Sequence, residues 1–433
     1  MNSQKQDAGE QQEAGLVKET FQAVDRYWFS YGSATPIGLF RICIGTLAVA
    51  DLLMLIPDWT TWFSEKGFVP SWLNDIFLGS RVPVGFGTPW SVPRISLLSG
   101  VTDARIGMAF FALTILAGVF TAFGLWTRVS SIALAIGMVS IQHRDAAILH
   151  GGDTVVRVGC MYLAIAPSGA ACSIDRLIGL WRRKISEAPV LVSLWPQRLI
   201  TFNLALIYLT TTWLKWGGGM WQNGTATYYP ARLPEFYRFP YPQFINDFPF
   251  VYLTTYGTLF VEFSMATLVF FKPLRKYVLL CGILMHAHIE YTMNIPLFSY
   301  LMVSYYICFY DGDEIAAWAG RIGERKRKWH VMVRMPVGMR LKPAAVGLLD
   351  SVDPFKLVHY LPGDSADWAA TRHDDSPLPV SQAIWTRSVG SWVFGWFPGV
   401  WKKILQNAIE PMPDEDEPAP RINKERKHIK AGG

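Results

Sequence analysis

The stretch that decides the fold reads Tyr208-Leu-Thr-Thr-Thr-Trp-Leu-Lys215-Trp-Gly-Gly-Gly-Met-Trp221-Gln-Asn-Gly-Thr225. An apolar helix runs here into a lysine between two tryptophans, and a triple-glycine break follows. Lys215 therefore lies about where a membrane span meets water. A charge at that depth is costly and indicates function, although a lysine that snorkels through an aromatic belt is the alternative.

Composition places the whole chain among integral membrane proteins. Of its 433 residues 51% are hydrophobic, with 18 Trp and 26 Phe, and the mean hydropathy is +0.21. Residues 1–15 are polar and show no signal-peptide pattern, so the first span is expected to be retained. The net charge of +6 fits basic cytoplasmic loops, and no nucleic-acid motif accompanies it. No two cysteines have C-x-x-C spacing, so we interpret them as small buried apolar residues. They are Cys43, Cys160, Cys172, Cys281 and Cys308.

Hydropathy predicts an all-α polytopic membrane protein with about eight transmembrane helices and a small C-terminal α/β region. An amphipathic helix, Leu16 to Tyr31, precedes the spans. Arg41 and Asp51 in the first span must face protein. We find no internal repeat in the sequence. The predicted spans are Thr35–Ile56, Arg105–Trp126, Val129–His150, Val155–Pro167, Arg198–Trp216, Val251–Phe271, Tyr277–Thr292 and Ile295–Phe309.

The positive-inside rule orients these spans. Alternate loops carry Arg128, Arg176–Lys184, Lys272–Lys276 and Arg321–Lys328, which predicts a multi-pass protein of the bacterial inner membrane with both termini cytoplasmic. The other loops hold three polar clusters, His143–Asp153, Lys215–Thr225 and Glu290–Ile295, which then share the extracytoplasmic side. Without the short fourth span, the clusters would separate.

Hydropathy falls after residue 315, which predicts four regions: a tail and amphipathic helix over 1–33, the membrane domain over 34–315, a soluble region over 316–409 and a disordered tail over 410–433. In the soluble region Val331–Met335, Pro343–Leu349 and Phe355–Tyr360 predict a β-α-β unit. Gln382–Ile409 predicts an amphipathic helix pair.

The polar residues admit both chemical and structural roles. In apolar surroundings Lys215 could become a neutral base, or it could belong to a plain ion pair. Glu262, buried in a span, needs a partner, and Lys215 or a histidine could supply one. His286 and Glu290, four residues apart on a helix, can touch, as a proton-shuttling pair or with the histidine in a packing role.

The remaining polar residues are more ambiguous. His143 and His150 lie nearly on one helical face if the helix continues, and Asp145 or Asp153 could orient either ring. No metal is expected, because the spacing lacks an H-E-x-x-H signature. Asn223-Gly-Thr225 is formally a glycosylation sequon, although a turn explains it as well.

The order of several motifs resembles the horizontally transferred transmembrane (HTTM) domain, which is related to vitamin K-dependent gamma-carboxylase. The resemblance covers roughly residues 30–315. It rests on Lys215 and Glu262 and on the segments Gly152-Asp153-Thr-Val-Val-Arg157, Tyr162-Leu-Ala-Ile-Ala-Pro167, Ser173-Ile-Asp175, Trp221-Gln-Asn-Gly224-Thr, Gly282-Ile-Leu-Met-His286 and Ile295-Pro-Leu-Phe298-Ser.

The resemblance implies a quinol-dependent, carboxylase- or oxygenase-like lyase. The matching lysine of the carboxylase deprotonates a reduced quinone, whose reaction with oxygen yields an alkoxide that removes a glutamate γ-proton. Lys215 would be that base, and His150 is the nearest counterpart of the helper histidine. The implied site comprises Lys215, His150, His286 and Glu262 as catalytic residues and Asp153, Trp221, Asn223 and Trp216 around a quinone of the vitamin K or menaquinol type.

The C-terminal region departs from the carboxylase, whose large lumenal domain has no counterpart here. It is similar instead to the opening of the thioredoxin-like DCC domain of bacterial relatives, but Val337-Gly-Met-Arg-Leu341 stands where the paired cysteines are expected.

Two other functions stay open. One is a non-catalytic accessory factor that assists maturation or export of a secreted peptide, similar to the sporulation-delaying-protein B group. The other is lipid or small-molecule binding or transport, for which a two-fold repeat would be expected. The expected partners are membrane lipid and a peptide or protein substrate.

Overall fold

The computed structural model describes residues 18–78, 81–83, 91–145, 148–182, 190–240, 242–353, 355–380 and 407–412, which are mostly helical. The chain divides into two compact units. Unit 1 comprises Met1–Ala171 and Val190–Asp311, and unit 2 comprises Cys172–Pro189 and Gly312–Gly433. The predicted N-terminal amphipathic helix is present over its described part, residues 18–29.

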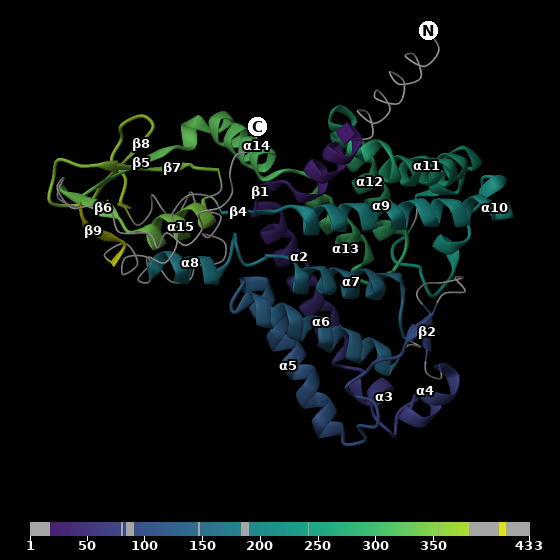
Figure 1. Cartoon of the computed structure of the whole chain (residues 1–433). Helices are drawn as coiled ribbons and strands as arrows, with labels where there is room; N and C mark the ends of the chain where they lie inside the picture. Colours follow the sequence, from purple (N-terminus) through teal and green to yellow (C-terminus); the bar gives the residue numbers. More distant parts are fainter. Residues whose placement is uncertain are drawn as a thin grey trace, which may run out of the picture. The chain divides into compact units, whose positions relative to one another are not determined.

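Each of the predicted spans coincides with a helical segment of unit 1 (Figure 1). The long helices are α2 (Thr35–Leu55), α5 (Ala104–Phe123), α6 (Thr127–Arg144), α7 (Gly151–Ile165), α9 (Trp195–Trp216), α11 (Phe248–Ala266), α12 (Lys272–Thr292) and α13 (Phe298–Ser304), which the 3-10 helix η4 (Tyr305–Phe309) continues. Shorter elements occupy the predicted loops: α3 (Trp59–Phe63), α4 (Ser71–Leu78), β2 (Arg81–Pro83), β3 (Ser91–Pro93), α10 (Gly219–Gln222), η1 (Pro230–Arg232), η2 (Gln243–Asn246) and η3 (Leu268–Phe270).

Two of the described helices, α2 and α5, are long and apolar enough to cross a membrane, and the α13–η4 segment is apolar but shorter. Eight crossings therefore stay a prediction. Exposed apolar side chains also recur at helical spacing on other helices, as they do on surfaces that contact a membrane or a partner. On α9 they are Phe202, Leu206, Leu209 and Trp213, and on α11 they are Leu253, Phe260 and Phe263.

The third predicted span is wrong at its C-terminal end. It was expected to continue to His150, but α6 ends at Arg144 and Asp145 adopts an extended backbone. A new helix, α7, begins at Gly151 because His150 and Asp153 form a capping box at its start. His143 and His150 therefore do not share one helical face.

The order of elements in unit 1 occurs twice, although no internal repeat is visible in the sequence. The strands β1 (Tyr31–Ser33) and β4 (Leu191–Ser193) pair antiparallel, and each leads into a long helix with proline in its first turn, α2 and α9. An aromatic loop with short helices follows in both halves, and then three more helical segments: α5, α6 and α7 in the first half, and α11, α12 and α13 in the second. This likeness in the order of elements is partial, because the β2–β3 hairpin of the first half has no counterpart among the described residues between α9 and α11.

The core of unit 1 joins both halves. It contains Phe40 and Ile44 of α2, Val156 of α7 and Tyr305 of η4. The Tyr305 hydroxyl donates a hydrogen bond to the Val155 carbonyl oxygen over 2.8 Å. Arg41 of the first span is fully buried in protein, as its charge requires.

Unit 2 contains the predicted β-α-β arrangement. β5 (Val331–Met335) pairs parallel with β7 (Val358–Pro362), and α15 (Pro343–Val352) connects them. β8 (Ala369–Arg372) adds to the other edge of β5, and β6 (Met339–Leu341) pairs with β9 (Ile409–Pro411). α14 (Gly312–Arg325), the 3-10 helix η5 (Arg327–Trp329) and α8 (Ile174–Trp181), which packs on α15, complete the unit.

The assignment of unit 2 to the thioredoxin-like class stays a prediction. Two calls on the C-terminal segment fall largely outside the described residues. The predicted helix pair over Gln382–Ile409 lies there except for its last three residues, and so does the predicted tail from residue 413 onward.

Candidate functional site

One face of α9 carries the polar residues of the candidate site. Tyr208, Thr211, Thr212 and Lys215 follow one another at helical spacing. The helix ends directly after Lys215, because Gly217, Gly218 and Gly219 follow Trp216. Its last turn therefore presents the lysine beside the loop that contains α10.

Lys215 and Glu262 form an ion pair, which confirms the lysine as the partner that Glu262 needs. Glu262 lies on α11, and its side chain is 8% exposed against 27% for Lys215. The hydroxyls of Thr211 and Thr212 lie 3.4 and 3.5 Å from the second carboxylate oxygen, Oε2. Both carboxylate oxygens of this buried side chain thus have polar partners, as a charge in an apolar setting requires.

A second set of contacts connects the same helix with α12 and η4. The Tyr208 hydroxyl lies 2.8 Å from His286 Nε2 and 2.7 Å from the Tyr306 hydroxyl. All three side chains are buried. Gly282 makes room for this cluster, because a Cβ atom there would lie 2.6 Å from the Tyr306 hydroxyl. The cluster is a continuous hydrogen-bonded connection between three helical segments.

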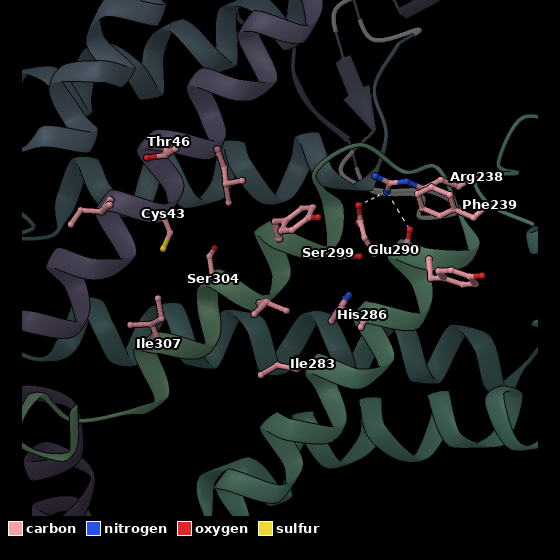
Figure 2. Close-up of a pocket in the computed structure, with 16 residues that line it drawn as sticks. Cys43, Thr46, Arg238, Phe239, Ile283, His286, Glu290, Ser299, Ser304 and Ile307 are labelled. Atoms are coloured by element: carbon pink, nitrogen blue, oxygen red, sulfur yellow. Dashed lines mark hydrogen bonds and ion pairs between the residues drawn. The ribbon is translucent and has the colours of Figure 1, made fainter. Parts of the chain in front are cut away.

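His286 also borders a large cavity between α2, α12 and α13 (Figure 2). Its volume is about 960 Å³, at the upper end of the usual range for small-molecule sites. Most of its lining is apolar, including Ile42, Ile283 and Ile307. Arg238 and Glu290 form an ion pair at one end, where Figure 2 also shows Ser299 and His286.

Three buried polar atoms of the cavity lining have no hydrogen-bond partner among the described residues: His286 Nδ1, Glu290 Oε2 and Ser299 Oγ. His286 and Glu290, whose spacing predicted that they could touch, both line the cavity but are not hydrogen-bonded to each other through these atoms. Buried polar atoms are usually satisfied. Their gathering at one end of an apolar cavity indicates a place for a ligand with polar groups.

His150 and Asp153 are in contact, which is one of the pairings that the sequence left open, but their role as a helix cap was not foreseen. His150 Nδ1 accepts a hydrogen bond from the Gly152 amide over 2.9 Å, and the His150 amide donates to Asp153 Oδ2. Neither residue lines the large cavity or contacts Lys215. They border a separate cavity of about 220 Å³ together with Asp51, Gln142 and Asp145.

The start of α13 lies against residues of both α7 and α12. Phe298, at the start of α13, packs edge-to-face on His286 with ring centroids 5.7 Å apart. Its Cα also lies 3.6 Å from where a Cβ of Gly152 would be. The start of α7 and His286 of α12 therefore both lie against the start of α13. The side of the membrane on which they lie stays a prediction.

The residues expected around a cofactor differ in their relation to Lys215. The Trp221 ring lies beneath its ammonium group, with Nζ 5.3 Å from the ring centroid. Asn223 Oδ1 accepts hydrogen bonds from the Thr225 amide and hydroxyl, so this segment is a turn. Trp216 is 63% exposed, which fits an aromatic side chain at a membrane interface. Among the described residues no cluster of metal-binding side chains occurs.

Sequence reasoning missed Tyr208, Tyr306, Arg238 and Ser299. Tyr208 could have been noticed, because it shares a helical face with Lys215. The others lie on segments remote in sequence: Tyr306 is 98 positions from Tyr208, and Arg238 is 52 positions from Glu290. No local pattern reports such contacts.

The fold defines a predominantly helical protein with membrane-type helices. The chain belongs to the HTTM family, since the HTTM domain model matches residues 86–313, more than half of its length. The resemblance drawn from the motifs is thereby confirmed, and with it the relation to gamma-carboxylase that the family carries. Neither a curated protein nor a solved structure gave a match.

Proposed function

We propose that this HTTM-family protein is a membrane enzyme in which Lys215, paired with Glu262, acts as a base toward a reduced quinone at the extracytoplasmic face. The observation that carries the proposal is the Lys215–Glu262 ion pair at the end of α9. A buried pair of this kind is costly to maintain and is seldom explained by stability alone. Ionisable pairs within membrane segments are often functional.

The ion pair can supply a neutral amine. In surroundings of low polarity the Lys215 ammonium can pass its proton to Glu262, which leaves both groups uncharged. The amine then accepts a proton from a hydroxyl group placed next to it, and the new ammonium offsets the negative charge left on that oxygen. Glu262 holds the first proton throughout, and Thr211 and Thr212 stay near its Oε2 atom.

The surroundings of Lys215 fit an aromatic co-substrate. The lysine side chain is 27% exposed and can be reached from outside the core, and the Trp221 ring beside it offers a face for stacking. Lys215 and Trp221 would hold the ring of a reduced quinone. When bound, that group supplies, together with oxygen, the strong base that abstracts a proton from a carbon acid.

A test compares quinone epoxide formation by full-length protein in liposomes supplied with menaquinol or reduced vitamin K and oxygen. We expect the wild type to form epoxide and Lys215→Met to form none. Lys276→Met is the matched control, because this lysine lies in the second turn of α12 with its ammonium group over the Tyr277 ring, whereas Glu262 is paired with Lys215. Epoxide from Lys215→Met at the wild-type rate, or none from folded wild-type protein with either quinol, would refute the proposal.

A second candidate is lipid or small-molecule binding or transport. Two observations favour it: the repeated order of elements in unit 1, which is common among transporters, and the cavity of about 960 Å³. Counterflow of a radiolabelled lipid in the same liposomes separates this function from the enzymatic one, because Lys215→Met would leave transport unchanged.

A further inference from the structure

We infer that the cavity between α2, α12 and α13 is a binding site for a single-chain lipid whose uncharged head carries hydroxyl groups. The inference goes beyond the proposed enzymatic function, because Lys215 does not line this cavity, and it deepens the second candidate function by naming the class of ligand. It rests on three observations: the apolar walls, the cluster of unsatisfied polar atoms at one end, and the charge balance at that end.

The walls fit an apolar chain that enters from the bilayer. Several lining residues are apolar and exposed, among them Ile42 at 36%, Ile283 at 41% and Tyr300 at 54%. In a membrane such exposed side chains face lipid. The cavity therefore opens toward the hydrocarbon region, and a chain can lie between α2 and α13 without crossing water.

The polar end fits hydroxyl groups. Glu290 Oε2 needs a donor, and Ser299 Oγ can both donate and accept. His286 Nδ1 carries a proton or lacks one according to the direction of the bond between His286 Nε2 and the Tyr208 hydroxyl. A hydroxyl group satisfies either state, because it donates and accepts.

The charges at this end exclude an ionised head. Arg238 and Glu290 neutralise each other, and no other charged side chain lines the cavity in the described part of the chain. A phosphate would meet the free lone pairs of Glu290 Oε2, and a quaternary ammonium would meet Arg238. Desolvation of either ion would go uncompensated.

The test uses full-length protein in phosphatidylcholine nanodiscs and a decyl glycerol ether that bears a diazirine. After irradiation, mass spectrometry locates the cross-linked residues. We expect cross-links on α2, α12 and α13 along the cavity. Four decyl compounds then compete: decyl hydroquinone, decyl glycerol ether, decyl phosphate and decyltrimethylammonium. The first two should compete, and the charged pair should be at least about tenfold weaker.

The two uncharged competitors distinguish the sources of the shared chemistry. If decyl hydroquinone is the stronger competitor, the cavity is a quinol site. If the glycerol ether is the stronger competitor, the cavity is a glycerolipid site. Either outcome supports the inference. Equal competition by decyl phosphate, or cross-links spread over the exposed face of α9 around Trp213 without competition, would overturn it.

Ser299→Ala is the informative variant. It removes a hydroxyl that has no partner in the described protein, so folding should be intact, whereas affinity for the uncharged probes should fall about two- to tenfold, the worth of one hydrogen bond. Ser264→Ala is the matched control, since this buried hydroxyl donates to the Phe260 carbonyl oxygen outside the cavity. Lys215→Met should bind the probes as the wild type does. Failure of the binding test and failure of the epoxide test can therefore be distinguished.

Discussion

The Tyr208 hydroxyl lies 2.8 Å from His286 Nε2, although 78 positions separate the two residues in the chain. Through this bond the polar face of α9 contacts the lining of the large cavity. The Lys215–Glu262 pair lies further along the same face of α9. His286 is thus the histidine that borders the cavity and contacts the helix of the candidate base. The bond thus connects the polar face of α9 with the lining of the large cavity, and the two sites can be tested separately.

The Lys215–Glu262 pair should show strong coupling in unfolding experiments. Lys215→Met leaves a carboxylate buried without its partner, so we expect a loss of about 3 kcal/mol in unfolding free energy. Glu262→Gln should cost less, because the partly exposed lysine can turn toward solvent. The double variant Lys215→Met with Glu262→Gln should be more stable than Lys215→Met alone, because it removes the unpaired buried carboxylate. Denaturant titration of the purified protein in micelles measures all four, and simple additivity would contradict a direct pair.

Gly282 should tolerate no side chain. A Cβ atom there meets the Tyr306 hydroxyl at 2.6 Å, so Gly282→Ala should cost about 1–3 kcal/mol through overpacking. Gly257→Ala is the matched control on α11, because its Cβ would meet nothing within 4 Å, and it should be neutral or stabilise by up to about 1 kcal/mol. Adding Tyr306→Phe to Gly282→Ala should restore part of the loss. Thermal unfolding measures the change in stability of each variant. Equal changes for Gly282→Ala and Gly257→Ala would contradict the close contact between Gly282 and Tyr306.

His150 should act as a helix cap. His150→Ala should lower unfolding free energy by about 1 kcal/mol, whereas His150→Ser, which keeps a capping acceptor, should retain most of it. Turnover per folded molecule should be unchanged in both. If both variants fold normally and lose epoxide formation, the histidine has the catalytic role that the family resemblance implies.

Unit 2 should lose stability in mild acid. His359 Nε2 lies 2.8 Å from His330 Nδ1, and His330 Nε2 donates to the Gly323 carbonyl oxygen. Burial first, and then the neighbouring His330, lower the pKa of His359 below its usual 6.5, while Asp353 acts in the opposite direction. The unfolded state therefore binds the proton first, and stability is lost as pH falls through about 6.5 toward the lower pKa of the folded state.

Hydrogen-exchange protection of β5 and β7, compared at pH 7.5 and pH 5.5, measures this effect. His359→Gln should reduce the pH dependence, and peptides from α2 serve as the internal reference. Greater protection at the lower pH would reverse the sign and refute the assignment.

Hydropathy predicted the helical segments well, because about twenty consecutive apolar residues have few alternatives to a helix in a membrane protein. The boundary between α6 and α7 was missed because a histidine caps α7, whereas Ser, Thr, Asp and Asn are the usual caps. The partner of Glu262 was foreseen from charge alone, since a buried carboxylate needs a cation.

The large cavity was not predicted at all. Its lining comes from α2, α12, α13 and the loop at Arg238, and only tertiary packing brings these segments together. Tyr208 and Tyr306 were missed for the same reason. In the sequence, a tyrosine within an apolar helix is interpreted as a core residue, because the hydrogen-bond partner of its hydroxyl is visible only in the structure.

The paired strands β1 and β4 are each followed directly by a long helix with proline in its first turn. At the distance from the first-turn proline at which α9 has Lys215, α2 has Leu55. One of these two matching helix ends is therefore apolar and the other ionisable, so the two helices differ in chemical character at equivalent positions.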